Sequence, residues 1–335
     1  MKTKKIIALL LLLASVTVAN AQQNVSFWKK NGTEVSTRDS CYFIRIISMP
    51  DSGTKLYNIK EYYKNGKIKV VGKTSRADMP SFEDQCVTYF ANGRKESVAT
   101  YKNGHVTGDY YRFFPNGKLY YQKNYYPVPP QNGTRKENSY ESKIVACGDS
   151  TGKQLVVDGN GHYVAYGEDF TDIEDEGEVK SGVREGEWKG RWHRTGVENV
   201  SLLDVTFKET YQNGKLLSGE SVATDGSTAT YTIREDDPSF KGGEEGFDRF
   251  LGRNVRYPED ARHSGIQGRV YLSFVIEKDG SLTNIKVVRN PNDELTAAAL
   301  SALKTSPKWT PGKFFGRPVR SVYTVPVAFT LGSPY

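Results

Sequence analysis

The stretch GRVYLSFVIEKDGSLTNIKVV, residues 268–288, decides the fold of the C-terminal part of this chain. Between residues 270 and 276, Val, Leu, Phe and Ile occupy every second position, which is the side-chain period of a β-strand. Lys278-Asp279-Gly280-Ser281 has the residue types of a tight turn, and residues 282–288 supply a return strand. The stretch therefore predicts an antiparallel hairpin.

The residues on both sides of this hairpin predict a small α+β domain. Residues 247–254 and 258–263 are expected to form short helices, interrupted because Pro258 disfavours a helical residue before it. Asn292 or Asp293 can cap an amphipathic helix that runs to about Thr305. With a final strand after this helix, the order strand–strand–helix–strand predicts one helix packed on a three-stranded antiparallel sheet.

The final strand is expected from Val319 to Leu331 and contains Pro326. Proline cannot donate a hydrogen bond to a neighbouring strand, so this strand should lie at an edge of the sheet. A free edge can accept an extended segment of another polypeptide as an added strand, mainly along the half that Pro326 does not blunt. Alternatively, Pro326 only protects the edge from aggregation. The predicted partner-binding residues are Val319, Ser321, Val322, Tyr323, Thr324, Val325, Val327 and Phe329.

The region before this domain is built on recurring Asn-Gly pairs, at Asn31, Asn65, Asn92, Asn103, Asn116, Asn132, Asn160 and Asn213. Asn-Gly suits a two-residue type I′ hairpin turn because both residues tolerate positive φ. A second pattern of turn, spacer, glycine, acid and aromatic aligns residues 103–110 with residues 181–188. The region resembles the MORN-type repeats of exported bacterial proteins (toxin–antitoxin MORN type), which implies an all-β array of stacked hairpins. Its aromatic residues are expected to pack neighbouring hairpins together or, alternatively, to line a ligand groove.

The N-terminus has the features of an export signal. Lys2, Lys4 and Lys5 precede an apolar run, and Ala19-Asn20-Ala21 offers small residues for cleavage. The expected organisation is therefore a signal peptide over residues 1–21, hairpin repeats over 22–235, a polar, glycine-rich linker over 236–246 and the α+β domain over 247–335. The apolar run is short for a membrane span, which favours a periplasmic protein over a membrane-anchored one.

Charge and reactive residues narrow the classes of function. Residues 247–335 carry 13 Lys and Arg against seven Asp and Glu, which favours an acidic partner or an anionic envelope surface, whereas an exported protein would rarely meet nucleic acid. Three cysteines and four scattered histidines match no metal-binding spacing, so no metal or cofactor is predicted. No nucleophile, phosphate-loop or metal motif is present, so the chain is not expected to be an enzyme.

Seven ordered blocks of the C-terminal domain resemble the TonB C-terminal domain family. They are Tyr257-Pro258-x-x-Ala261, Gly265-Ile266-Gln267-Gly268-Arg269-Val270, Phe274-Val275-Ile276-x-x-Asp279-Gly280, Ala298-x-Leu300-x-Ala302, Pro307-Lys308-Trp309-x-Pro311-Gly312, Gly316-x-Pro318-Val319 and Pro326-Val327-x-Phe329. The preceding Asp237-Pro238-x-Phe240-x-Gly242-Gly243 resembles the lead-in of Bacteroidetes members of that family.

The resemblance implies that the domain binds the TonB box, an extended segment of an outer-membrane receptor, as an added strand. It also implies a possible box contact at Asn254, where glutamine is the usual residue. Tyr257, Pro258 and Trp309 are expected to pack the helices on the sheet, while Gly268, Gly280, Pro311 and Gly312 belong to the same structural motif. The resemblance links the chain to TonB-dependent transmembrane transport.

Three functions follow from these expectations. The first is a periplasmic adaptor that binds receptor or partner segments through the C-terminal domain. The second is an inner-membrane energy transducer that keeps residues 1–21 as an anchor, although the apolar run lacks the family's histidine and no long proline-rich spacer follows it. The third is a non-catalytic envelope scaffold.

Overall fold

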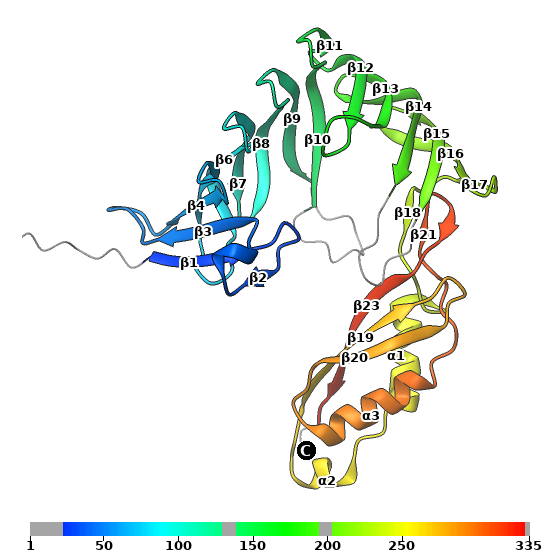
Figure 1. Ribbon diagram of the computed structural model, residues 1–335. Coiled ribbons are helices and arrows are strands. Elements are labelled where there is room, and N and C mark those ends of the chain that lie inside the picture. The colour runs from blue at the N-terminus through cyan, green and yellow to red at the C-terminus, as the bar shows by residue number, and fades with distance from the viewer. Residues whose placement is uncertain (1–22, 129–138, 194–202, 332–335) are drawn as a thin grey trace, which may run out of the picture. The chain divides into compact units, whose positions relative to one another are not determined.

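The computed structural model describes residues 23–128, 139–193 and 203–331 (Figure 1). The predicted signal peptide and the Asn132 turn lie outside these residues. The chain divides into two compact units within strand β10 (Ser139–Gly148): the first ends at Ser142 and adds Gly148–Lys153, and the second comprises Lys143–Cys147 and all residues from Gln154. Within the described ranges, no helix has the length and apolarity that crossing a membrane requires.

The first unit is an antiparallel meander in which each strand from β3 to β9 pairs with the next along the chain. Strand β1 pairs with both β2 and β3. The elements are β1 (Gln23–Trp28), β2 (Glu34–Val35), a 3-10 turn (Arg38–Ser40), β3 (Phe43–Ser48), β4 (Tyr57–Tyr63), β5 (Ile68–Thr74), β6 (Phe82–Tyr89), β7 (Lys95–Lys102), β8 (His105–Phe113) and β9 (Leu119–Val128).

The Asn-Gly turns adopt two geometries. At Asn103-Gly104 and Asn213-Gly214 both residues have positive φ, which is the predicted type I′ turn. The type I′ prediction is wrong at Asn160, which begins a strand (Asn160–Tyr166) after a turn at Asp158-Gly159, and at Asn31, where only Gly32 has positive φ. It is also wrong at Asn65, Asn92 and Asn116, where only the following glycine has positive φ. In these three loops the asparagine Oδ1 accepts the backbone N–H two residues further on, at 2.9 to 3.0 Å. The loop is a turn closed by the asparagine side chain and by a glycine bulge.

Neighbouring turns of the first unit are tied together by side-chain hydrogen bonds. Asn92 Nδ2 donates to the Pro115 carbonyl at 2.8 Å, and Asn116 Nδ2 donates to the Ser150 carbonyl at 2.7 Å. Asparagine therefore acts twice, because Oδ1 closes its own loop while Nδ2 joins the next one. Aspartate could accept the first bond but could not donate the second, which gives the recurrence of asparagine a physical reason.

The hairpin array of the second unit runs from β11 to β17, again with each strand paired to the next. The glycine of the second sequence pattern forms a bulge: Gly108 and Gly186 have φ of 67° and 64°, at points where the ladder register shifts. The strands are β11 (Gln154–Val157), β12 (Asn160–Tyr166), β13 (Ile173–Lys180), β14 (Val183–His193), β15 (Asp204–Gln212), β16 (Lys215–Ala223) and β17 (Thr228–Tyr231).

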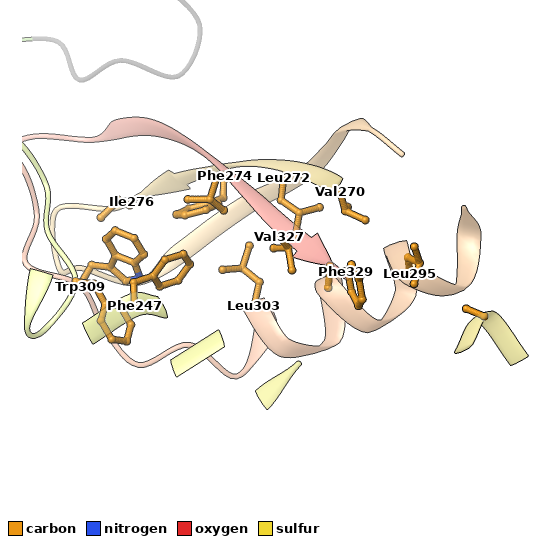
Figure 2. Packing of buried hydrophobic residues seen from close by; sticks show 14 residues of the cluster. Phe247, Val270, Leu272, Phe274, Ile276, Leu295, Leu303, Trp309, Val327 and Phe329 are labelled. Atoms are coloured by element: carbon orange, nitrogen blue, oxygen red, sulfur yellow. The ribbon is translucent and has the colours of Figure 1, made fainter. Parts of the chain in front are cut away.

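The C-terminal domain of the second unit is a helix on a three-stranded antiparallel sheet of order β20-β19-β23, as predicted. Figure 2 shows side chains of α3, such as Leu295 and Leu303, packed against those of β19 and β23. Asn292 caps α3, accepting N–H groups from Glu294 and Leu295 at 2.8 and 3.1 Å. The elements are α1 (Gly243–Asn254), α2 (Glu259–His263), β19 (Gly268–Ile276), β20 (Leu282–Arg289), α3 (Asp293–Lys304) and β23 (Ser321–Phe329).

Two predicted boundaries of this domain are wrong. The segment 236–246, expected to be a linker, includes the start of α1 and places Phe240 in the core against Phe247 and Trp309, because a buried aromatic ring outweighs the polar composition around it. The last strand covers Ser321–Phe329 only. Before it, β21 (Lys313–Phe314) pairs with β22 (Arg317–Pro318) and with β18 (Glu235–Asp236).

The β21–β22 hairpin joins the domain to the last hairpins of the second unit. Its tip residue Phe315 is fully buried among Val205, Phe207 and Tyr231, which we term the Phe315 seat. The Phe315 and Phe207 ring centroids are 4.8 Å apart, and the Phe315 carbonyl accepts the Ser221 hydroxyl at 2.8 Å. This contact is made by the β21–β22 hairpin and does not involve β23. The outer flank of β23 pairs with no strand of the described residues.

A buried carboxylate supports the Phe315 seat. Glu209 accepts hydrogen bonds from Arg234, Tyr231 and Tyr211, and the Arg234 carbonyl accepts the Phe315 N–H at 2.8 Å. Burial alone would raise the pKa of Glu209, but the Arg234 guanidinium and the two tyrosine hydroxyls outweigh it and the pKa is lowered. Glu209 is therefore an ionised, fully paired group beneath the junction.

Candidate partner-binding edge

Strand β23 lies at one edge of its sheet and presents two different faces. Val325, Val327 and Phe329 are buried in the core, whereas Val322 and Thr324, which alternate with them, are exposed. The alternation follows from the strand period of two. The predicted edge residues thus divide into a core-facing set and a solvent-facing set, and only the second can contact a partner through side chains.

The backbone of β23 alternates in the same way. Pro326 is paired in register with Tyr271 of β19. Because Pro326 has no N–H, it must occupy a position whose backbone groups point away from β19. The backbone N–H and C=O groups of Val322, Thr324 and Ala328 then also point to the free flank. Ala328 was not among the predicted edge residues, because its small side chain gave no signal of its own.

The N-terminal end of the predicted edge requires a correction. Val319 lies between β22 and β23, and its N–H donates to the Gly312 carbonyl at 2.9 Å, so it extends the β21–β22 hairpin and does not pair with β19. Ser321 pairs with Ile276 at the first ladder position. Gly312 accommodates this turn, since a Cβ there would meet the Ser321 hydroxyl oxygen at 2.8 Å. Val319 therefore contributes to the start of the edge from a loop.

Several residues of the predicted structural motif pack against the sheet near Trp309. Trp309 is buried against Phe274, Phe247 and Tyr323. Its backbone leaves no room for a side chain at Gly280, where a Cβ would lie 2.0 Å from the Trp309 carbonyl oxygen. Pro311, two residues beyond Trp309, is half-buried. These residues hold the loop between α3 and β23.

The remaining motif residues lie at the other end of the domain. The Tyr257 hydroxyl donates to the Ile266 carbonyl at 2.6 Å, and its ring packs edge-on against Phe329. Pro258 immediately precedes α2. A Cβ at Gly268 would meet the ring of Pro291 at 2.8 Å. Together they fix the C-terminal end of β23.

Asn254, the predicted box contact, is the last residue of α1 and is exposed. Its Nδ2 donates to the Phe250 carbonyl one turn earlier, at 2.8 Å. The side chain thus closes its own helix, and its Oδ1 is the group that remains to accept a hydrogen bond from a partner.

A groove opens at the start of β23, and its lining combines the C-terminal domain with the last hairpins. We call it the β23 groove; it has a volume of about 490 Å³. Sequence reasoning missed it, because half of its walls come from residues that precede the domain. Its lining residues are Trp192, Leu203, Glu235, Asp236, Asp237, Pro238, Lys313, Phe314, Val319, Arg320, Ser321, Val322 and Tyr323.

The electrostatics of the groove are set by carboxylates. The pKa of the Tyr323 hydroxyl is raised, first by burial and then by the negative charges of Glu244 and Asp237. At the same end of the strand, Arg320 donates to Glu277 at 2.7 and 2.9 Å and, with Thr283, lowers the pKa of that carboxyl. The positive charge of Arg320 is therefore neutralised by Glu277 within the domain.

The structure offers no metal-type cluster in the ranges 23–128, 139–193 and 203–331: no three His, Cys, Asp or Glu side chains converge there as ligands. Cys41, Cys86 and Cys147 are buried and form no disulfide with one another. Burial raises the pKa of the Cys86 thiol to about 11 and keeps it protonated.

Residues 253–331 match the family described as Gram-negative bacterial TonB protein C-terminal. The chain is 42% identical over 78 residues to Protein TonB from two strains of Helicobacter pylori, 26695 and J99, which covers 23% of this chain and 26% of each relative. It therefore spans about a quarter of the length of these relatives.

The solution structure of the Helicobacter pylori TonB C-terminal domain matches with 35% sequence identity. The match covers 26% of this chain and 78% of that domain, with a TM-score of 0.21. Residues 253–331 are therefore similar in sequence to the Gram-negative bacterial TonB C-terminal family.

Proposed function

We propose that this protein is a periplasmic adaptor that binds a segment of an outer-membrane receptor, or of another envelope protein, as an added strand on β23, in support of TonB-dependent transmembrane transport. The observation that carries the proposal is the outer flank of β23, with which no strand of the described residues pairs. Its ladder with β19 runs the whole length of the strand, so the edge is rigid before a partner arrives. A preformed edge reduces the entropy lost on binding.

The edge predicts a weak, transient complex. Val322, Thr324 and Ala328 each offer an N–H and a C=O, while Pro326 offers a C=O alone. Ladder hydrogen bonds at roughly 1 kcal/mol net each do little more than offset an association cost of about 4 kcal/mol or more. Side-chain contacts must supply the rest, so a dissociation constant of about micromolar or weaker is expected.

Thr324→Pro tests the proposal in the full-length chain. The substitution removes an outward N–H without removing a bond to β19, so it should leave the fold intact, as Pro326 does. Calorimetric titration with a synthetic TonB-box peptide of an outer-membrane receptor should show at least about tenfold weaker binding, because one ladder bond is lost and the ring obstructs its neighbours. The matched control is Thr324→Val, which keeps the N–H and removes only the hydroxyl.

Equal affinities of Thr324→Pro and Thr324→Val would refute strand addition at this edge. The same comparison tests the scaffold alternative, since a pure scaffold should be indifferent to both substitutions. Removing the whole strand is a poorer test, because Val325, Val327 and Phe329 are core residues and the domain would unfold.

The location belongs to the proposal and has its own test. Mass spectrometry of the N-terminus should find Gln22 as the first residue of the protein in the periplasmic fraction. An intact Met1 in membrane fractions would instead favour the inner-membrane energy transducer.

A further inference from the structure

The β23 groove begins where the free edge begins. Ser321, Val322 and Tyr323 line it, and two of the predicted edge positions, Val322 and Thr324, continue from it along the exposed side of the strand. A segment paired with β23 that extends past Val322 would enter this groove. The groove is therefore a continuation of the proposed binding edge.

The last hairpins supply one wall of the groove. Trp192 belongs to β14, and Leu203 precedes β15. The Trp192 ring is fixed by Phe314, with ring centroids 5.1 Å apart, and by Phe315 at 6.2 Å. The Phe315 seat thus holds the indole beside the start of the edge strand, within the same compact unit.

The other wall is acidic. Glu235, Asp236 and Asp237 are exposed, and no ion pair to them occurs in the part of the chain that the structure describes. Lys313 is paired in register with Asp236, so its side chain lies on the same side of the β18–β21 ladder as Asp236. The remaining base, Arg320, is paired with Glu277. Glu235 and Asp237 therefore line the same groove as Trp192 and have no ion-pair partner among the described residues.

We propose that the β23 groove receives a lysine or arginine side chain of the segment bound on β23, so that the last hairpins help to select the partner. This inference rests on the proposed function. Carboxylates attract the cation, the Trp192 face can stack against it, and the apolar lining accepts its methylene stem. The basic composition of the domain makes this acidic recess a local feature and not a property of its whole surface.

The test compares two forms of one receptor-segment peptide, with arginine or with glutamine just beyond the paired residues. Each form is made with the extra residue at the N-terminal end and at the C-terminal end, because either direction of the added strand is possible. The full-length protein is used as wild type and as the double variant Glu235→Gln/Asp237→Asn. The control variant, Asp248→Asn/Glu259→Gln, makes the same charge change at exposed positions outside the groove.

In one of the two orientations, the arginine peptide should bind wild type and control about five- to tenfold more tightly than the glutamine peptide. The double variant should reduce this preference to within about twofold, while its affinity for the glutamine peptide stays unchanged. The preference should also weaken between about 0.05 and 0.5 M salt, because the Debye length shortens.

Two outcomes overturn the inference and are distinguishable. If the peptides bind and Thr324→Pro weakens them, but arginine gives no advantage or keeps it in the double variant, the groove proposal is wrong while strand addition stands. If no peptide binds wild type, or Thr324→Pro has no effect, the proposed function fails and the groove proposal fails with it.

Discussion

Replacing Phe315 with alanine should separate the C-terminal domain from the last hairpins without unfolding either core. Phe315 is fully buried in the Phe315 seat, and Arg234 lies over its ring with Cζ 5.0 Å from the centroid. The core of the domain beneath β19 and β23 is a separate cluster that does not include Phe315. The substitution therefore acts on the junction.

The magnitude follows from the burial. Truncating a fully buried phenylalanine costs about 3–5 kcal/mol, through lost transfer free energy and the cavity that remains. Phe315 also has φ of 50°, a left-handed conformation that costs a non-glycine residue about 1 kcal/mol and that alanine would share. Because both residues bear this strain, it cancels from the difference in stability, and the expected loss is that of the truncation alone.

Hydrogen exchange read by mass spectrometry can locate the effect. In Phe315→Ala, amides of β16 and β17 should exchange at least about 100-fold faster, since each 1.4 kcal/mol corresponds to a factor of ten. Peptides from α3 and β19 should keep their protection. The adjacent residue gives a matched control: Phe314 is only half-buried, so Phe314→Ala should cost about 1–2 kcal/mol.

Equal exchange in Phe315→Ala and Phe314→Ala, or a change below about threefold in β16 and β17, would refute the reasoning. Loss of protection in α3 and β19 to the same extent would show instead that the domain and the hairpins unfold as one cooperative unit.

Three further outcomes are expected. Glu209→Gln should destabilise the second unit by about 3–5 kcal/mol at neutral pH in urea unfolding, because Arg234 loses its buried partner. Since the pKa of Glu209 is lowered in the folded protein, its stabilisation is present above the ordinary value of 4.5 and is lost as pH falls below it, so wild type and variant should converge in acid. Asn292→Ala should cost about 1 kcal/mol of thermal stability through loss of the α3 cap, with Asn292→Asp as the tolerated control. Gly280→Ala should prevent the native contact with Trp309 and lower soluble yield, whereas alanine at the open Gly252 should not.

Much of the C-terminal domain was predictable because its determinants are local. The alternation in residues 270–276, the Asn292 cap and the proline inside the last strand each act within a few residues of where they stand. The edge position of β23 follows from one missing N–H at Pro326. The same local chemistry predicts Asn-Gly hairpins, although it does not distinguish a type I′ turn from a loop closed by the asparagine side chain.

The linker prediction failed for the opposite reason. Residues 236–246 are polar and rich in glycine, and this composition hides the one ring, Phe240, that packs against Trp309. The hydrogen bond between Ser221 and Phe315 joins residues 94 positions apart, and no pattern within either segment indicates the other. The Phe315 seat and the β23 groove could therefore not be predicted.

The sequence by itself determined the hairpin repeats, the helix on its three-stranded sheet and the strand with a proline-marked edge, because backbone hydrogen bonding and side-chain period depend on neighbouring residues. Only the tertiary structure decided which backbone groups of that edge are open, that Val319 lies outside the strand, and that Trp192 and Asp237 line one groove at its start. Those outcomes depend on packing between distant segments, which is fixed by shape and burial in three dimensions and not by any spacing along the chain.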